Sequence, residues 1–206
     1  MAELMNDYIS IFVFFFAVID PIGTVPVFIA VTSGFDEKAK RKIALRAALV
    51  SACILLFFII AGELILTAID VPLPAFQIAG GLVLFIFALT MIFGESKPEE
   101  ELKMTGSSTQ TAIFPLAVPS IASPGAMLAA VLLTENSQFS LIEQAETAVI
   151  MLSVLLVVLL LMLIAGRVHR FIGQGGASIV SRVMGLILSS VAVNNVLVGM
   201  QEFFGL

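Results

Sequence analysis

One apolar stretch, Phe12–Phe28, constrains the fold more than any other part of the chain. It has the length of a membrane-spanning helix, yet it contains an acid, Asp20, followed by Pro21, Gly23 and Pro26. Proline and glycine interrupt a helix, and lipid offers no hydrogen bonds to the freed backbone groups. The stretch therefore predicts two half-helices that meet near the bilayer midplane, with Asp20 as the N-cap and Pro21 as the first residue of the second half.

Asp20 has two interpretations at this depth. An ionisable group inside a membrane is costly and is by default a functional residue, which makes Asp20 a candidate for binding a coupling ion or an ammonium group. The structural alternative is a proline kink whose buried cap is satisfied by its own half-helix. The sequence favours the functional interpretation and leaves the structural one open.

Composition places the rest of the chain in the membrane as well. Of the 206 residues, 60% are hydrophobic and 12% are charged, and the mean hydropathy is +1.13. A span needs about 20 residues, so six spans leave room for short loops and predict a single transmembrane domain over 1–206. No basic face with interleaved aromatic residues supports nucleic-acid binding.

Six apolar segments follow one another along the chain. The expected spans are Tyr8–Thr32, Ile43–Thr67, Ala75–Phe93, Thr111–Leu133, Thr147–Gly166 and Ile179–Phe203. The polar stretch Gly94–Gln110 is expected to be a long loop, and a shorter loop rich in glycine is expected between Arg167 and Arg182.

The basic residues predict the orientation. All ten Lys and Arg lie in the first, third and fifth connections between spans or at the adjoining helix ends. The N-terminus, the second and fourth connections and the C-terminus have none. The positive-inside rule then puts both termini on the non-cytoplasmic side of the cell inner (plasma) membrane.

The chain also matches itself at an offset of about 104 residues. The matching segments are Asp20–Gly23 with Ser123–Gly125, Ile60–Glu63 with Ile164–Arg167, and Gly80–Leu82 with Met184–Leu186. Each unit has three spans, an odd number, so the second copy must cross the membrane in the opposite sense. The predicted fold is an all-α polytopic membrane protein of six helices in two inverted three-helix repeats (about 8–94 and 111–203), with helices 1 and 4 broken.

The two breaks together predict a binding site. Ser123 can cap a half-helix that begins at Pro124, as Asp20 does in the first repeat. Half-helix N-termini favour anionic groups, while the Asp20 carboxylate suits an ammonium group or a proton. The pair of breaks therefore predicts a small zwitterion, an amino acid, as the ligand.

Further candidates are the small and polar residues near the breaks and in the last span. The full set of candidate substrate-binding residues is Asp20, Pro21, Gly23, Pro26, Ser120, Ser123, Pro124, Gly125 and Asn194. Asn194 and Asn195 point about 100° apart on a helix, so one of the two is expected to line a site. Interhelical hydrogen bonding is the alternative role for these asparagines and for Thr90.

At the two breaks the chain resembles the MarC family of six-span inner-membrane proteins, which overlaps the small neutral amino acid transporters. The resemblance covers nearly the whole chain and is carried by DPIGTVPVF at Asp20–Phe28 and FPLAVPSIASPGA at Phe114–Ala126. Ser123 stands where the family more often has glycine. The resemblance implies membrane transport of small neutral amino acids such as glycine or alanine for some members.

The leading hypothesis is a secondary transporter that moves a small neutral amino acid by ion-coupled alternating access, with H⁺ or Na⁺ as the coupling ion. The alternatives are a channel or exporter for another small solute and a structural or regulatory membrane protein. An enzyme is not expected, because the chain lacks the H-E-x-x-H and G-x-S-x-G patterns; no catalytic residue, metal or cofactor is predicted. The chain also lacks a P-loop pattern, so ATP is not expected to drive transport directly. The expected partners are the lipid bilayer and a small-molecule substrate, and a homo-oligomer is left open.

Overall fold

The computed structural model describes residues 2–93, 108–136 and 138–205, and in these residues it contains helices and no strand. The helices are α1 (Ala2–Ile19), α2 (Pro21–Thr32), α3 (Glu37–Ala68), α4 (Leu73–Phe93), α6 (Ser108–Thr111), η1 (Ala112–Ile121), α7 (Pro124–Leu132), α8 (Leu141–Leu163) and α9 (Ala165–Phe204). The segment η1 is π-helical and is interrupted by extended backbone at Phe114 and Val118.

The described residues hold five segments long and apolar enough to cross a membrane, or six if the bent pair η1 and α7 forms one span. The segment Tyr8–Thr32, which contains α2 and most of α1, counts as one of the five. The prediction of an all-helical protein with several membrane spans is confirmed at this level.

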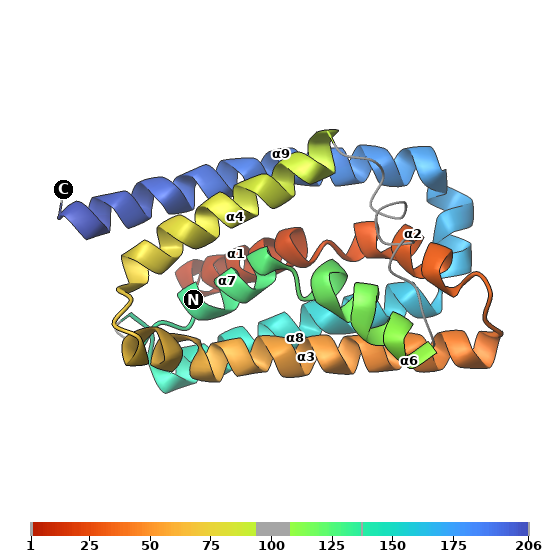
Figure 1. Cartoon of the computed structure of the whole chain (residues 1–206), viewed down its shortest axis with the longest axis horizontal. Helices are drawn as coiled ribbons and strands as arrows, with labels where there is room; N and C mark the ends of the chain where they lie inside the picture. The colour runs from red at the N-terminus through yellow and green to blue at the C-terminus, as the bar shows by residue number, and fades with distance from the viewer. Residues whose placement is uncertain (1, 94–107, 137, 206) are drawn as a thin grey trace.

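Figure 1 shows the helices in three layers. α4 and α9 run side by side along one face, α3 and α8 run along the opposite face, and the interrupted helices lie between them. In the most apolar part of Tyr8–Thr32, 61% of the residues are buried, against 17–33% in the other four spans. Interrupted backbone survives in a membrane only when protein or a water-filled cavity surrounds it. The central layer gives the interrupted helices that protection, and the continuous outer helices leave most of their surface exposed.

Polar caps explain where α3 and α8 begin. The Ala39 amide donates to Asp36 Oδ1 at 3.0 Å at the start of α3. At the start of α8, Ser140 and Glu143 form a capping box in which each side chain accepts from the backbone amide of the other. Both helices therefore begin six residues before the expected apolar spans, at 37 rather than 43 and at 141 rather than 147.

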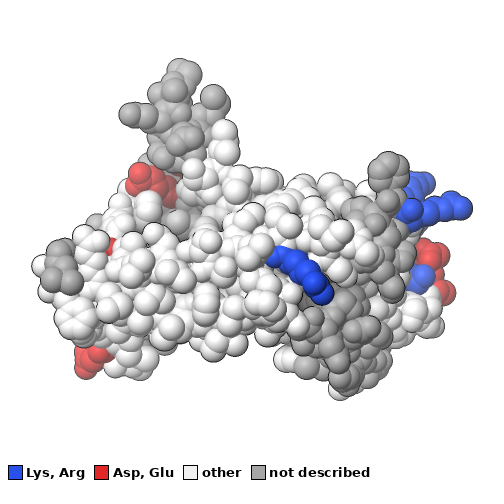
Figure 2. Space-filling model, turned by 90° about the horizontal axis from the view of Figure 1, so that it is seen from above, with Lys and Arg blue, Asp and Glu red and all other residues white. Residues whose placement is uncertain are grey.

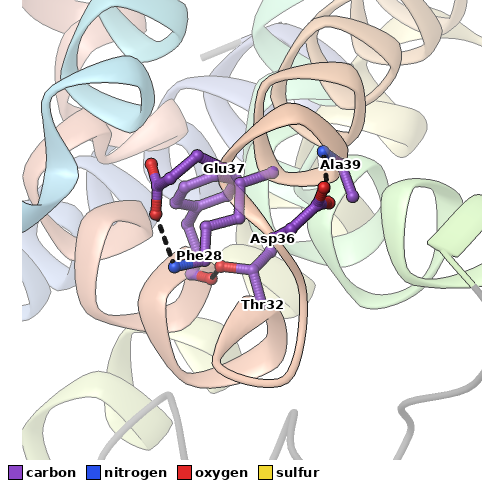
Figure 3. A network of polar contacts seen from close by, with 6 residues as sticks. Phe28, Thr32, Asp36, Glu37 and Ala39 are labelled. Carbon is purple, nitrogen blue, oxygen red and sulfur yellow. Dashed lines mark hydrogen bonds and ion pairs between the residues drawn. The ribbon is translucent and has the colours of Figure 1, made fainter.

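A tight turn joins α2 to α3 (Figure 3). The Thr32 hydroxyl donates to the Phe28 carbonyl in the last turn of α2, and Asp36 caps the first turn of α3. The Lys40 ammonium then pairs with Glu37 at 2.9 Å, one turn apart on α3. The basic start of α3 thus lies directly beside the end of α2.

The predicted loop between Arg167 and Arg182 is wrong, because α9 is helical from Ala165 onwards. Glycine costs a helix only about 1 kcal/mol relative to alanine, so the glycine cluster does not end the helix. The candidate span within α9 begins at Ser178, and Figure 1 shows α9 turning a corner before it runs along α4. The other predicted loop, Gly94–Gln110, lies almost entirely outside the described residues.

Candidate functional site: two helix breaks in the central layer

The first break is at Asp20, between α1 and α2. Its backbone is left-handed (φ 51°, ψ 67°), a conformation that aspartate adopts more readily than most residues with a side chain. The Gly23 amide donates to Asp20 Oδ1 at 2.9 Å, and the Asp20 amide donates to the Phe16 carbonyl at 3.1 Å. Asp20 is 2% exposed. A buried carboxylate therefore ends α1 and caps α2.

Glycine at position 23 leaves the space that this cap requires. A Cβ atom added to Gly23 would lie 2.0 Å from Asp20 Oδ2, far inside van der Waals contact. The Asp20 carboxylate packs directly over the first turn of α2, and any larger residue at position 23 would displace it.

The second break is between η1 and α7. Ser123 has an extended backbone and caps α7, because its Oγ accepts from the Ala126 amide at 3.1 Å. Pro124 is the first residue of α7, as Pro21 is of α2. The axes of η1 and α7 are bent by 57°, and Ser123 is fully buried.

One hydrogen bond joins the two breaks. The Ser123 hydroxyl donates to the Val18 carbonyl at 2.8 Å across 105 residues of sequence. Val18 is in the last turn of α1, where carbonyl groups lack an N–H donor within their own helix. The serine at the second break therefore supplies the hydrogen bond that a backbone carbonyl loses at the first break.

Most of the other predicted residues lie at these breaks. Pro21, Gly23 and Gly125 are buried, Ser120 is 1% exposed, Pro26 is half-buried and Pro124 is exposed. The asparagines of α9 lie differently. Asn194 is on an exposed face, whereas Asn195 is 9% exposed and its Nδ2 has no hydrogen-bond partner among the described residues.

Thr90 is exposed, and its hydroxyl donates to the Phe87 carbonyl of its own helix at 2.7 Å. Two buried hydroxyl residues that sequence reasoning missed lie nearer the breaks. Thr24 donates to the Asp20 carbonyl at 3.0 Å. Ser51 of α3 donates to the Ala47 carbonyl at 2.9 Å and lies 3.4 Å from the Ala117 carbonyl of η1. The sequence could have indicated that Ser51 is buried, because its hydroxyl stands at helical spacing from small apolar residues.

Charged groups are sparse in this region. Asp20 is the only charged residue between positions 8 and 35, and positions 108–134 contain none. In the described part of the chain, no three His, Cys, Asp or Glu side chains cluster closely enough to hold a metal ion. The breaks thus offer one carboxylate, several hydroxyl groups and the positive ends of two helices.

This architecture defines a polytopic, all-helical integral membrane protein. The chain belongs to the MarC family, since the model for "MarC family integral membrane protein" matches residues 5–204. It is 32% identical over 203 residues to a UPF0056 membrane protein of Methanocaldococcus jannaschii, covering 96% of this chain and 97% of that one. It is also 28% identical over 206 residues to the UPF0056 membrane protein YvbG of Bacillus subtilis, covering 98% and 97% of the two chains. No solved structure gives a significant match. The predicted family resemblance is confirmed.

Replacing Ser123 with alanine is expected to destabilise the protein by about 1–3 kcal/mol, because the change removes the α7 cap and the bond to Val18. The measurement is reversible unfolding of the purified protein in mixed detergent micelles. Ser153→Ala is the matched control, since that exposed hydroxyl donates within its own helix, to Ile150 at 2.6 Å. Equal losses in the two variants would contradict a bond that holds the two breaks together.

Proposed function

We propose that this protein is a secondary transporter that moves a small neutral amino acid, of the glycine or alanine type, by ion-coupled alternating access. One observation carries the proposal: two capped helix starts, at Asp20 and Ser123, are buried in the central layer and joined through the Ser123–Val18 hydrogen bond. Interrupted helices whose ends meet inside a bundle are the usual sites of substrate and ion binding in secondary transporters.

The proposed architecture is a pair of inverted three-helix repeats, and reciprocal contacts between α4 and α9 support it. A Cβ atom at Gly81 would lie 2.9 Å from the Ala192 carbonyl oxygen, and one at Gly185 would lie 2.9 Å from the Ala88 carbonyl oxygen. Position 185 is 104 residues after 81, and position 192 is 104 residues after 88. Each contact therefore pairs a residue of α4 with the repeat counterpart of the residue that makes the other contact. Such an exchange is what a two-fold axis between equivalent units produces.

The outer layers support the same relation. α3 begins at Glu37 after the cap Asp36, and α8 begins at Leu141 after the cap Ser140, again 104 residues apart. Each of these helices packs beside its counterpart, as α4 does beside α9 (Figure 1). A repeat unit of three spans would reverse the second copy in the membrane.

The proposed orientation follows from charge. The described basic residues lie on α3 and α9. On the face in Figure 2 they appear near one end of the molecule and at one place near its middle, while acids appear at both ends. Both termini lie toward the end opposite the start of α3 (Figure 1). By the positive-inside rule, the termini would be on the non-cytoplasmic side of the cell inner membrane.

The chemistry of the breaks suggests the ligand. The Asp20 carboxylate would bind the ammonium group of an amino acid or the coupling ion, H⁺ or Na⁺. The start of α7, which has no acid, would favour the substrate carboxylate. The spaces beside Gly23 and Gly125 are taken by the side chains of Asp20 and Leu84, so only a small substrate would fit at the breaks.

A structural or regulatory membrane protein is the second candidate, and one observation favours it. Asp20 is buried and caps its own half-helix through the Gly23 amide, which a purely structural kink also requires. A channel or exporter for another small solute would use the same breaks and differs in its kinetics. Saturation and counterflow separate a carrier from a channel.

Purified protein in proteoliposomes is expected to take up labelled glycine or alanine saturably, and faster under one imposed gradient, of protons or of sodium. Empty liposomes and a non-cognate ion gradient are the controls. Linear uptake without counterflow would indicate a channel. Absence of uptake of both amino acids under every gradient would refute the proposed substrate class.

A further inference from the structure

Asn195 of α9 carries a polar group that the two breaks do not use. It is 9% exposed, and its Nδ2 atom is buried and has no hydrogen-bond partner in the described part of the chain. A buried amide donor without a partner costs free energy that native proteins normally avoid, and lipid supplies no hydrogen bond to it. Hydrogen bonding between helices, the structural role of a buried asparagine, therefore does not account for this NH₂ group.

Two close contacts fix how α4 lies along α9. A Cβ atom at Gly81 would lie 2.9 Å from the Ala192 carbonyl oxygen, and one at Gly199 would lie 2.9 Å from the Pro74 carbonyl oxygen. The two contacts are seven residues apart on α4 and seven residues apart on α9. The helices run in opposite directions between them, because the earlier position on α4 meets the later position on α9.

Gln77 of α4 and Asn195 of α9 lie at the same level, midway between those two contacts. Each is three residues after one contact and four residues before the other, so in this antiparallel pair both point about 50° to the same side of the line of contact. Leu84 and Leu188 have the same angular position seven residues away, and both are fully buried. Leu84 contacts the second break, since a Cβ atom at Gly125 would lie 2.5 Å from its Cδ1. Both amides therefore face the central layer.

The two amides lie between the breaks and the end of the bundle that holds both termini. Gln77 is four residues, or about 6 Å, inside the start of α4 at Leu73, and α4 begins at that end (Figure 1). Leu84, which packs on the second break, is about 10 Å further along α4. A solute that enters from that end would meet the amides before it reached the breaks.

We propose that Gln77 and Asn195 form an outer binding site for the substrate, in which the Asn195 amide donates to the substrate carboxylate. A carboxamide has two N–H donors and one acceptor oxygen, so the pair can bind both charged ends of a zwitterion. Neither amide carries a charge, and a neutral amino acid would therefore be released toward the breaks more readily than from an ion pair. The inference rests on the proposed transport of such an amino acid.

Equilibrium dialysis of labelled glycine against the purified full chain in neutral detergent tests the site. The wild type is expected to bind one glycine at the breaks and a second at the amides. Asn195→Leu, which keeps the number of side-chain heavy atoms, should weaken the second site roughly 10- to 150-fold and leave the first intact. The loss is large because the hydrogen bond that disappears is to a charged group.

The thermal unfolding midpoint separates this role from a structural one. Without ligand, Asn195→Leu is expected to unfold at the wild-type temperature or above it, because the substitution removes a buried donor that has no partner in the described residues. An asparagine that joined two helices would lower the midpoint when replaced. Gln201→Leu is the matched control, an exposed amide of the same helix, and it should bind both glycines.

If Asn195→Leu does not fold, Gln77→Leu tests the same site, because Gln77 is half-buried and its loss should weaken the second site roughly two- to tenfold. A second glycine that the leucine variants bind as tightly as the wild type would overturn the outer site and leave the proposed transport standing. So would a wild type that binds a single glycine and loses it in Asp20→Asn. A wild type that binds neither glycine nor alanine would overturn the proposed substrate class and the outer site together.

Discussion

Asp20→Asn is expected to abolish gradient-driven uptake while the fold persists. Asparagine is as good an N-cap as aspartate and tolerates the left-handed backbone found here, so the bond from the Gly23 amide can be kept. The substitution removes the charge that would hold an ammonium group or a coupling ion. Losing one partner of a buried charge pair costs about 2–5 kcal/mol, or roughly 30- to 4,000-fold in affinity.

The measurement pairs proteoliposome uptake with a thermal unfolding midpoint for each variant. Gly23→Ala is expected to lower both the uptake and the unfolding midpoint. Its Cβ would lie 2.0 Å from Asp20 Oδ2 and push the carboxylate away from α2. Gly34→Ala is the control, since a Cβ at Gly34 meets no atom within 4 Å. Asp20→Asn protein that transports like the wild type would assign Asp20 a purely structural role.

Gly81→Ala and Gly185→Ala are each expected to destabilise the protein by about 1–3 kcal/mol. In each variant the new Cβ would lie 2.9 Å from a carbonyl oxygen of the facing helix, Ala192 or Ala88. Backbone cannot move aside as a flexible side chain can, so α4 and α9 would have to separate. The gain in helix propensity, about 1 kcal/mol for alanine over glycine, reduces the net loss.

Gly166→Ala is the matched control, because Gly166 is also helical and a Cβ there has no neighbour within 4 Å. The double variant Gly81→Ala with Gly185→Ala should lose less than the sum of the single losses, since each change already separates the same two helices. Unfolding in mixed micelles measures all four proteins. Fully additive losses would contradict a single shared crossing of α4 and α9.

Much of the architecture is local in origin and could therefore be predicted. Hydropathy identified the membrane spans because about 20 apolar residues in a row have no other stable environment. Aspartate or serine followed by proline predicted where α2 and α7 begin, because a cap and its helix are only a few residues apart. The expected loop at Arg167–Arg182 was wrong for a related reason, since a glycine cluster is a weak signal that flanking helix can override.

The relation between the two breaks depended on the tertiary structure. Sequence indicated that Asp20 and Ser123 are alike, but the contact of Ser123 with Val18 requires segments 105 residues apart to pack together. An apolar sequence also does not distinguish a lipid-facing side from a helix-facing one, which is why Asn194 was predicted in the site while Asn195 is the buried asparagine of the pair.

The sequence by itself therefore determined the class of protein, the membrane spans and the capped starts of α2 and α7, because each depends on residues near one another in the chain. Only the tertiary structure decided that the interrupted helices occupy the centre and that α4 crosses α9 at Gly81 and Gly185. These features depend on which surfaces pack against each other, and hydropathy carries no information about the choice of partner.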